Sequence, residues 1–530
     1  MMTRWLAVLA PLVLLAIPLA LREHHVATAT KALPLVIITP NNEAIRTEFS
    51  RAFSTFAVRE LGHDVEIDWR TPGGMSDISK LINEQYTAVA AARLPGFDRA
   101  TFNNPKAGDA DARKAFLASE LGIDIDLLFG GGEFENRILA EKGYLVDAGL
   151  LQALPEIFRD DVIPQTLAGE IIYDAQGRYY GTALSSFGIC YNPDRLQALV
   201  SPRQGPYASP EDQRTSPLKS WDDLAHPALM GHLVVADPTK SGSVAACYVM
   251  ILQEQLARAV KSGGATFATA TAEQLDAGWR QGLTLIKAMV GNARLVTDSA
   301  SKVPRDVGRG DAIAGMCIDF YGRSEAEWTR QESGHERVVF VTPQGGTSMS
   351  SDPIALLRGA PHRAEAVAFM RFVLSVDGQR LWNYRVGEPG GPKRYALRRW
   401  SVRRDLFTPE HLAHSSDPGE DPFVLAQSFH FEPAWTAPYF DLIRSTIKAV
   451  ILDPREELQD AWRAIVAADR PDSPAWKEFI WLPYDYRNIA AAKKRLAEDR
   501  ITTMREWTIA AQHHYRAAAR LARDSMQEQH

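Results

Sequence analysis

The residues of this chain that are best suited to hold a ligand lie where an apolar strand turns into an apolar helix. Leu233–Ala236 is predicted to be the strand, Asp237–Lys240 the turn, and Ser241, Gly242 and Ser243 the start of the helix. Serine at a helix start satisfies backbone N–H groups, and glycine lets the backbone approach a bound group. Because the N-terminal end of a helix is electropositive, the segment predicts capture of an anion. An ordinary helix cap is the alternative.

Several other predicted strands also end in small or polar residues. In open α/β sheets, ligands bind outside the carboxyl ends of the strands, so two facing sheets would gather these loops into one cleft. The candidate ligand-binding residues in these loops are Asn41, Asn42, Gly131, Gly132, Ser185, Ser186, Asp319 and Tyr321.

Each of these loops also has a purely structural interpretation. Asn41 and Asn42 follow the first strand, and at least one amide is expected to contact the ligand, although either could form a local turn. The glycines at 130–132 either present bare N–H groups to the ligand or only allow a tight turn and a hinge, and the two roles do not exclude each other. Ser185 and Ser186 face opposite sides of an extended strand, so we expect one of them to reach the cleft.

Nothing in the sequence points to catalysis. It contains no G-x-S-x-G elbow, no G-x-x-x-x-G-K-[ST] loop and no H-E-x-x-H motif. We therefore expect a binding protein with no catalytic residue, no cofactor and no resident metal. Cys190, Cys247 and Cys317 all lie in apolar contexts and fit no zinc spacing. Buried free thiols are predicted for them, with one disulfide as the alternative.

Charge and the N-terminal segment limit the partners and the compartment. The 530-residue chain has a net charge of −6, which does not favour nucleic acid, and the basic cluster Arg398, Arg399, Arg403 and Arg404 is predicted to be a solvated face. The apolar run Trp5–Leu21 resembles an export signal, and the small residues Ala27–Ala29 could follow it as a cleavage site. An uncleaved N-terminal anchor is the alternative. We expect an exported, periplasmic or extracytoplasmic monomer.

The hydrophobic pattern predicts strands that alternate with helices, which is typical of parallel α/β sheets. From Gly387 the pattern changes: residues 408–438 are expected to be irregular, and one long helix is expected from about 488 to 527. The predicted strands are Leu35–Ile38, Val65–Trp69, Asp124–Phe129, Tyr180–Tyr191, Leu233–Ala236, Ala312–Phe320, Val338–Thr342 and Ile354–Leu357.

The order of these segments resembles that of the extracellular solute-binding proteins of family 1, in the ferric-iron-type branch of ABC transport. The similarity covers residues 33–405. The segments that carry it are Val36–Glu43, Asp126–Gly132, Trp221–Leu224, Ala236–Ser243 and the helix Ala364–Leu374 leading into Asp377-Gly378-Gln379.

This resemblance implies a type 2 periplasmic-binding-protein fold, in which two α/β lobes joined by two crossovers close on a ligand. Lobe 1 is expected to comprise 33–184 and 343–390, and lobe 2 to comprise 185–342. The signal or anchor would occupy 1–29. A mainly helical C-terminal extension would occupy 391–530. It would either only pack on one lobe or serve as a docking element for a membrane partner or a sensor.

The resemblance also bears on the ligand. Ferric binders of this family use two adjacent tyrosines, whereas this chain has Phe320 beside Tyr321. Asp319 and Tyr321 suit an organic solute that carries a donor group beside an anionic group. We therefore expect the substrate-binding component of an ABC importer, which captures a phosphonate, sugar phosphate or carboxylate and delivers it to an inner-membrane permease. The alternatives are a ferric-iron binding protein and an accessory binding protein of a two-component sensor.

Overall fold

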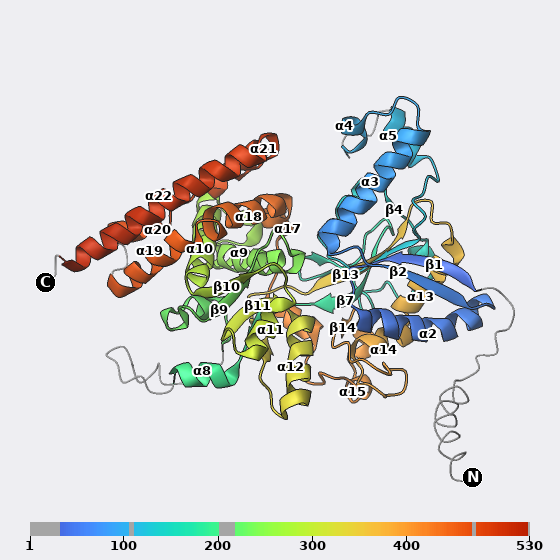
Figure 1. Ribbon diagram of the computed structural model, residues 1–530. Coiled ribbons are helices and arrows are strands. Elements are labelled where there is room, and N and C mark those ends of the chain that lie inside the picture. Colours follow the sequence, from blue (N-terminus) through green and yellow to red (C-terminus); the bar gives the residue numbers. More distant parts are fainter. Residues whose placement is uncertain (1–31, 105–110, 201–217, 469–472, 528–530) are drawn as a thin grey trace, which may run out of the picture.

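The computed structural model describes residues 32–104, 111–200, 218–468 and 473–527. The expected signal at 1–29 lies outside these residues. Within the described part of the chain, no helix combines the length and the apolar character needed to cross a membrane. The chain forms two α/β lobes that lie side by side, and the C-terminal helices that follow residue 432 pack against the second of them (Figure 1).

Lobe 1 is built on a sheet with the strand order β14-β7-β13-β3-β1-β2, with β4 paired to β13. Its central strand β3 is wholly buried, and β1 is buried from Leu35 to Ile38, as expected of parallel strands covered on both faces. The strands are β1 (Leu33–Ile38), β2 (Val65–Arg70), β3 (Leu127–Phe129), β4 (Leu145–Val146), β7 (Tyr180–Ser185), β13 (Ser350–Leu357) and β14 (Trp400–Ser401), with a separate hairpin of β5 (Thr166–Leu167) and β6 (Glu170–Ile171).

Helices of lobe 1 cover both faces of this sheet. Phe49 and Phe53 on one face of α2 are fully buried, and the ring of Phe53 lies 4.9 Å from that of Phe369 in α13. The helices are α2 (Glu43–Leu61), α3 (Met75–Arg93), α4 (Arg99–Phe102), α5 (Asp111–Leu117), α6 (Glu133–Glu141), α7 (Leu150–Ala153), α13 (Arg363–Leu374) and α14 (Val376–Asn383).

Lobe 2 has a sheet of order β10-β9-β11-β8-β12. Its strands are β8 (Phe187–Tyr191), β9 (Leu233–Ala236), β10 (Ala293–Thr297), β11 (Ala314–Ile318) and β12 (Val339–Val341). Its helices are α8 (Pro193–Val200), α9 (Gly242–Ser262), α10 (Ala272–Gly291), α11 (Lys302–Arg309) and α12 (Asp319–Ser333).

The two sheets share one plan. In each, three parallel strands are followed by an antiparallel strand that begins at a crossover, β13 in lobe 1 and β8 in lobe 2. The chain passes between the lobes at Ser186, between β7 and β8, and again between β12 and β13. This topology confirms the expected two-lobe α/β fold of the type 2 periplasmic-binding-protein class.

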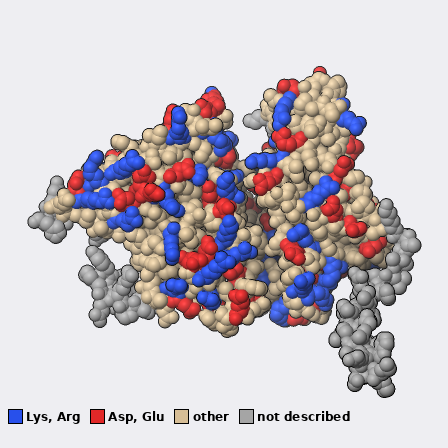
Figure 2. Space-filling view, viewed as in Figure 1, with Lys and Arg blue, Asp and Glu red and all other residues tan. Residues whose placement is uncertain are grey.

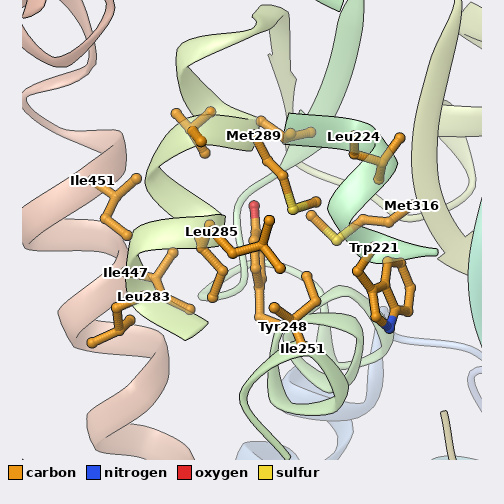
Figure 3. Close-up of a cluster of buried hydrophobic side chains, with 14 of the residues drawn as sticks. Trp221, Leu224, Tyr248, Ile251, Leu283, Leu285, Met289, Met316, Ile447 and Ile451 are labelled. Carbon is orange, nitrogen blue, oxygen red and sulfur yellow. The ribbon is translucent and has the colours of Figure 1, made fainter. Parts of the chain in front are cut away.

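The C-terminal segment is part of both lobes. Trp400–Ser401 adds β14 to the sheet of lobe 1, whereas Ile447 and Ile451 of the π-helix Ile447–Leu452 are fully buried in lobe 2. Figure 3 shows these two isoleucines beside Leu283 and Leu285 of α10. The helices are α15 (Pro409–Leu412), α16 (Pro422–Leu425), α17 (Pro433–Thr436), α18 (Phe440–Thr446), α19 (Arg455–Ala468), α20 (Pro474–Phe479), α21 (Ile489–Glu498) and α22 (Arg500–Gln527).

Three expectations from the sequence are corrected. The long C-terminal helix is two helices, because Asp499 has non-helical φ and ψ and its side chain accepts from the N–H of Thr502. The stretch 408–438 contains short helices, several begun by proline at the first turn. Asp319 opens α12 instead of ending a strand. The three cysteines are buried and free, as expected.

Candidate functional site

A cavity of about 530 Å³ lies between the carboxyl ends of the two sheets. Lobe 1 contributes Asn41, Gly131 and Gly132 to its wall, and lobe 2 contributes the 241–243 segment and Tyr321. The cavity opens at the hollow between the two halves of the molecule (Figure 2). The structure therefore brings together seven of the predicted residues, which come from four separate loops.

The start of α9 forms the lobe 2 side of the cavity. Asp237 shapes the turn, since its Oδ1 accepts from the backbone N–H of Thr239 at 2.8 Å and from its hydroxyl at 2.6 Å. Ser241 occupies the cap position, but within the described residues its side chain caps no N–H group. The hydroxyls of Ser241 and Ser243 lie 3.4 Å apart. The start of this long helix thus lines the cavity, and its first N–H groups have no side-chain cap from Ser241.

On the lobe 1 side, glycine backbone faces the cavity. Gly130 and Gly131 have φ values of +103° and +84°, which side-chain-bearing residues rarely adopt. A Cβ on Gly131 would lie 2.5 Å from the sulfur of Met75. Asn41 lies beside this loop and donates from its amide to the carbonyl of Phe129 at 3.2 Å. The loop therefore brings bare backbone to the cavity wall and cannot easily carry side chains.

The structure places four predicted residues elsewhere. Asn42 caps α2 by accepting from the N–H of Ile45 at 3.1 Å. Ser185, Ser186 and Asp319 are fully buried where the chain crosses between the lobes. The hydroxyl of Ser186 lies 3.3 Å from that of Thr342. None of the four lines the cavity: a helix cap holds the amide of Asn42, and the packing of the crossovers buries the other three. Asn41 meets the expectation for the first loop, whereas the expected contacts of one crossover serine and of Asp319 are not found at the wall.

Arg399 organises this crossover region. Its guanidinium donates to the hydroxyl of Ser185 at 2.5 Å and to the carboxylate of Asp352 at 2.6 Å, and it lies 4.5 Å from the centre of the Phe320 ring. Arg399 is 1% exposed, so the predicted solvated face is wrong at this position. Burial raises the pKa of Asp319 to about 6, and the nearby Arg323 and Arg399 oppose this rise.

Sequence reasoning missed the carboxylates of the cavity. Glu133, Glu135 and Glu170 line it, and burial raises the pKa of each, that of Glu170 to about 7. The hydroxyls of Tyr179 and Ser348 donate to Glu133 and Glu170. Two of these acids follow the predicted glycine loop directly, which is a signal that could have identified them.

Aromatic rings and a C-terminal segment complete the wall. Phe134, Phe187 and Phe320 come from the two lobes, while Phe431 and Phe440 come from beyond the expected lobes. No local pattern marks the last two, since their position depends on a long-range contact. Tyr321, on which the ferric-iron alternative depends, also lines the cavity, and burial raises its pKa. Within the described residues, no group of three or more His, Cys, Asp or Glu side chains could hold a metal ion.

Comparison with known proteins gives one family match. Residues 139–390 match the family model described as bacterial extracellular solute-binding protein. A curated relative, the phosphoglycerate transport regulatory protein PgtC of Salmonella typhimurium, is 23% identical over 199 residues. That alignment covers 38% of this chain and 39% of the relative, so it spans well under half of PgtC.

Two solved structures are similar at low identity. The periplasmic binding protein AfuA from Actinobacillus pleuropneumoniae, with exogenous fructose-6-phosphate bound, is 16% identical, with a TM-score of 0.48 over 82% of this chain and 98% of that one. Iron-bound HitA from Pseudomonas aeruginosa is also 16% identical, with a TM-score of 0.45 over 78% of this chain and 98% of that one. Because both scores are below 0.5, these ligands carry no argument for this chain.

Proposed function

We propose, from the premise that residues 139–390 belong to the bacterial extracellular solute-binding family, that this chain captures a small anionic organic solute between its lobes. It would be the substrate-binding component of an ABC importer. In this role it is an exported monomer that closes on its ligand and presents it to a permease without converting it. The ligand class is a phosphonate, a phosphate ester or a carboxylate.

The observation that carries this proposal is the start of α9 in the cavity wall. A helix of this length presents an electropositive N-terminal end, and its first N–H groups suit an anion. Across the cavity, Asn41, Gly131 and Gly132 of lobe 1 can meet the other end of the same ligand. A solute held in this way touches both lobes, so its binding favours the closed form.

The acids in the cavity refine the ligand class. Glu135 lies at the start of α9 itself, because its Oε1 would be 3.6 Å from a Cβ on Gly242, so an anionic group at α9 must displace this carboxyl group or bind beside its protonated form. Glu133 and Glu170 would repel an anion lying against them, so the part of the ligand near them should offer hydrogen-bond donors. A hydroxylated phosphate ester has this character. The curated relative is named for the transport of phosphoglycerate, which makes 3-phosphoglycerate the first probe.

The test is calorimetric titration of phosphate esters, phosphonates and carboxylates into the wild-type chain and into the double variant Ser241→Ala/Ser243→Ala. A hydrogen bond to a charged group contributes about 1.5–3 kcal/mol, so we expect affinity to fall roughly tenfold or more in the double variant. Ser262→Ala, at the other end of α9, is the matched control and should bind as the wild type does. Unchanged affinity in the double variant would remove the hydroxyls of Ser241 and Ser243 from the anion site.

A second candidate role follows from the word "regulatory" in the relative's name. In that role the ligand-bound chain would act on a membrane sensor instead of a permease. The two roles are separated by adding the ligand-bound protein to a reconstituted permease and to a reconstituted sensor kinase. Stimulated ATP hydrolysis by the permease supports import, and altered autophosphorylation of the kinase supports the regulatory role.

A further inference from the structure

We propose that residues 431–448, which lie beyond the region matched by the family model, form a third wall of the ligand site. In this wall Phe440 limits the size of the ligand, and Arg444 is a positioning residue for the turn that begins α9. The role of Phe440 in choosing a ligand depends on the proposed function, whereas the geometry of the wall does not.

The first observation is where this segment lies. Phe431, Thr436, Ala437 and Phe440 line the cavity. The ring of Phe440 lies 4.6 Å from that of Phe134, which belongs to α6 of lobe 1. An aromatic contact between the C-terminal segment and lobe 1 therefore bounds the cavity on one side, and the space left for a ligand is reduced there.

The second observation is how the segment is fixed to lobe 2. Gln253 of α9 is fully buried, and its amide donates to the carbonyl of Glu432 at 2.8 Å and to the hydroxyl of Thr436 at 2.7 Å. Its side-chain oxygen accepts from the N–H of Glu432 at 3.2 Å. A buried amide whose donor and acceptor ends both reach the same distant segment makes the docking specific, because leaving either end unpaired is costly.

The segment is also fixed to lobe 1. The N–H of Phe431 donates to the carbonyl of Ala168 at 2.8 Å. Next to it, Gly169 has φ of +91°, and a Cβ there would lie 1.8 Å from the carbonyl oxygen of Phe431. Only glycine allows this approach, so the hairpin of lobe 1 is shaped to receive the segment.

The third observation links the segment to the predicted anion site. Arg444 donates from Nε to the carbonyl of Pro238 at 2.9 Å and from Nη2 to the carbonyl of Thr239 at 3.1 Å. Lys448 lies 3.2 Å from the carboxylate of Asp237. Both cations hold the turn that precedes Ser241, so they fix the direction of the N–H groups at the start of α9.

A ligand-free experiment tests the positioning role. Hydrogen exchange is measured at the hydrogen-bonded amides of Lys240, Ser241 and Ala245, which close the turn and the first turn of α9. It is compared between the full chain, Arg444→Ala and the control Arg516→Ala, which removes an exposed arginine paired with Glu457 in the same extension. We expect about tenfold faster exchange at these amides in Arg444→Ala only, because opening there becomes easier. Arg444→Gln, which keeps a donor, should lie between. Unchanged exchange in both Arg444 variants would overturn the role.

The wall itself is tested by thiol labelling. The native cysteines are fully buried, so a thiol introduced by Phe134→Cys is the reactive one. With Phe440 in place this thiol should be shielded, and adding Phe440→Ala should speed its labelling by about tenfold. Equal rates in the two proteins would overturn the wall.

Ligand selection gives a separate outcome. We expect Phe440→Ala to shift the ratio of affinities from 3-phosphoglycerate toward the larger glucose 6-phosphate, and an unchanged ratio would contradict the size limit. If the wild-type chain binds neither ester, the proposed ligand class fails. The exchange and labelling experiments use no ligand, so they decide the third wall independently.

Discussion

The carboxyl group of Glu170 couples the cavity to pH. Burial raises its pKa from a usual 4.5 to about 7, the negative charge of Glu133 adds to the rise, and the bond from Ser348 opposes it. Between these two values the unfolded chain has lost the proton and the folded chain still holds it. The folded state therefore loses stability as pH rises through this window.

Glu170→Gln tests this coupling. One pKa unit corresponds to about 1.4 kcal/mol, so the wild-type chain should lose roughly 3 kcal/mol more than the variant as pH rises from about 4.5 to 7. Urea unfolding at several pH values measures the difference. The exposed Glu498→Gln is the control and should follow the wild type. Parallel stability curves for wild type and Glu170→Gln would contradict a Glu170 that keeps its proton in the folded chain.

At the scale of elements, the strand-end loops position the site through backbone conformation. Gly131 is constrained twice, by its positive φ and by the sulfur of Met75. Gly62 at the end of α2 has a similar φ of +76°, but a Cβ there would meet no atom within 4 Å. Alanine variants of Gly131 and Gly62 therefore separate two effects. Both variants strain the backbone, but only the Gly131 variant also adds a methyl group at the cavity wall.

We expect Gly62→Ala to lower the free energy of unfolding by about 1–2 kcal/mol, since alanine disfavours a left-handed backbone. Gly131→Ala should lower it by more, because its Cβ must also displace the side chain of Met75. Only Gly131→Ala should also weaken binding of the anionic probe. Urea unfolding and calorimetric titration measure the two effects. A Gly131→Ala chain that binds as tightly as Gly62→Ala would show that this loop does not face the ligand.

The C-terminal elements stabilise lobe 2 from inside. Ile451 is fully buried among residues of α10 and α22, whereas Ile509 of α22 is 59% exposed. Ile451→Ala should lower the free energy of unfolding by about 2–5 kcal/mol, because the cavity left behind is not refilled. Ile509→Ala should change it by less than about 0.5 kcal/mol. Similar values for both variants would mean that the extension only covers the surface.

The sequence predicted the parts of the site that depend on local signals. The strand, turn and helix around Asp237 and Ser241 follow from residues close in sequence, and so does the glycine loop at 130–132. Arg399 could not be placed, because its burial arises only when β14 joins lobe 1 beside the crossovers. Phe440 could not be placed either, because Gln253, far earlier in the chain, fixes its segment. The break at Asp499 had a local signal, an acid three residues before Thr502.

At the scale of the whole molecule, the chain crosses between the lobes more often than a minimal two-lobe binder requires. Besides the two crossovers near Ser186 and between β12 and β13, residues after β14 run from lobe 1 to lobe 2 and contact both. Removing everything after residue 407 would take Ile447 and Ile451 from the core of lobe 2. Truncation would therefore destabilise lobe 2. Single substitutions are needed to distinguish a role of the C-terminal extension in docking to a partner from its role in stability.

The most direct measurement is the structure of the chain with 3-phosphoglycerate bound. We predict that the anionic group lies within about 3 Å of the first N–H groups of α9, a normal hydrogen-bond distance, and that lobe 1 contacts the same molecule through Asn41 or Gly132. A ligand that binds on an outer surface, or one whose anionic group lies away from Ser241–Ser243, would contradict the account.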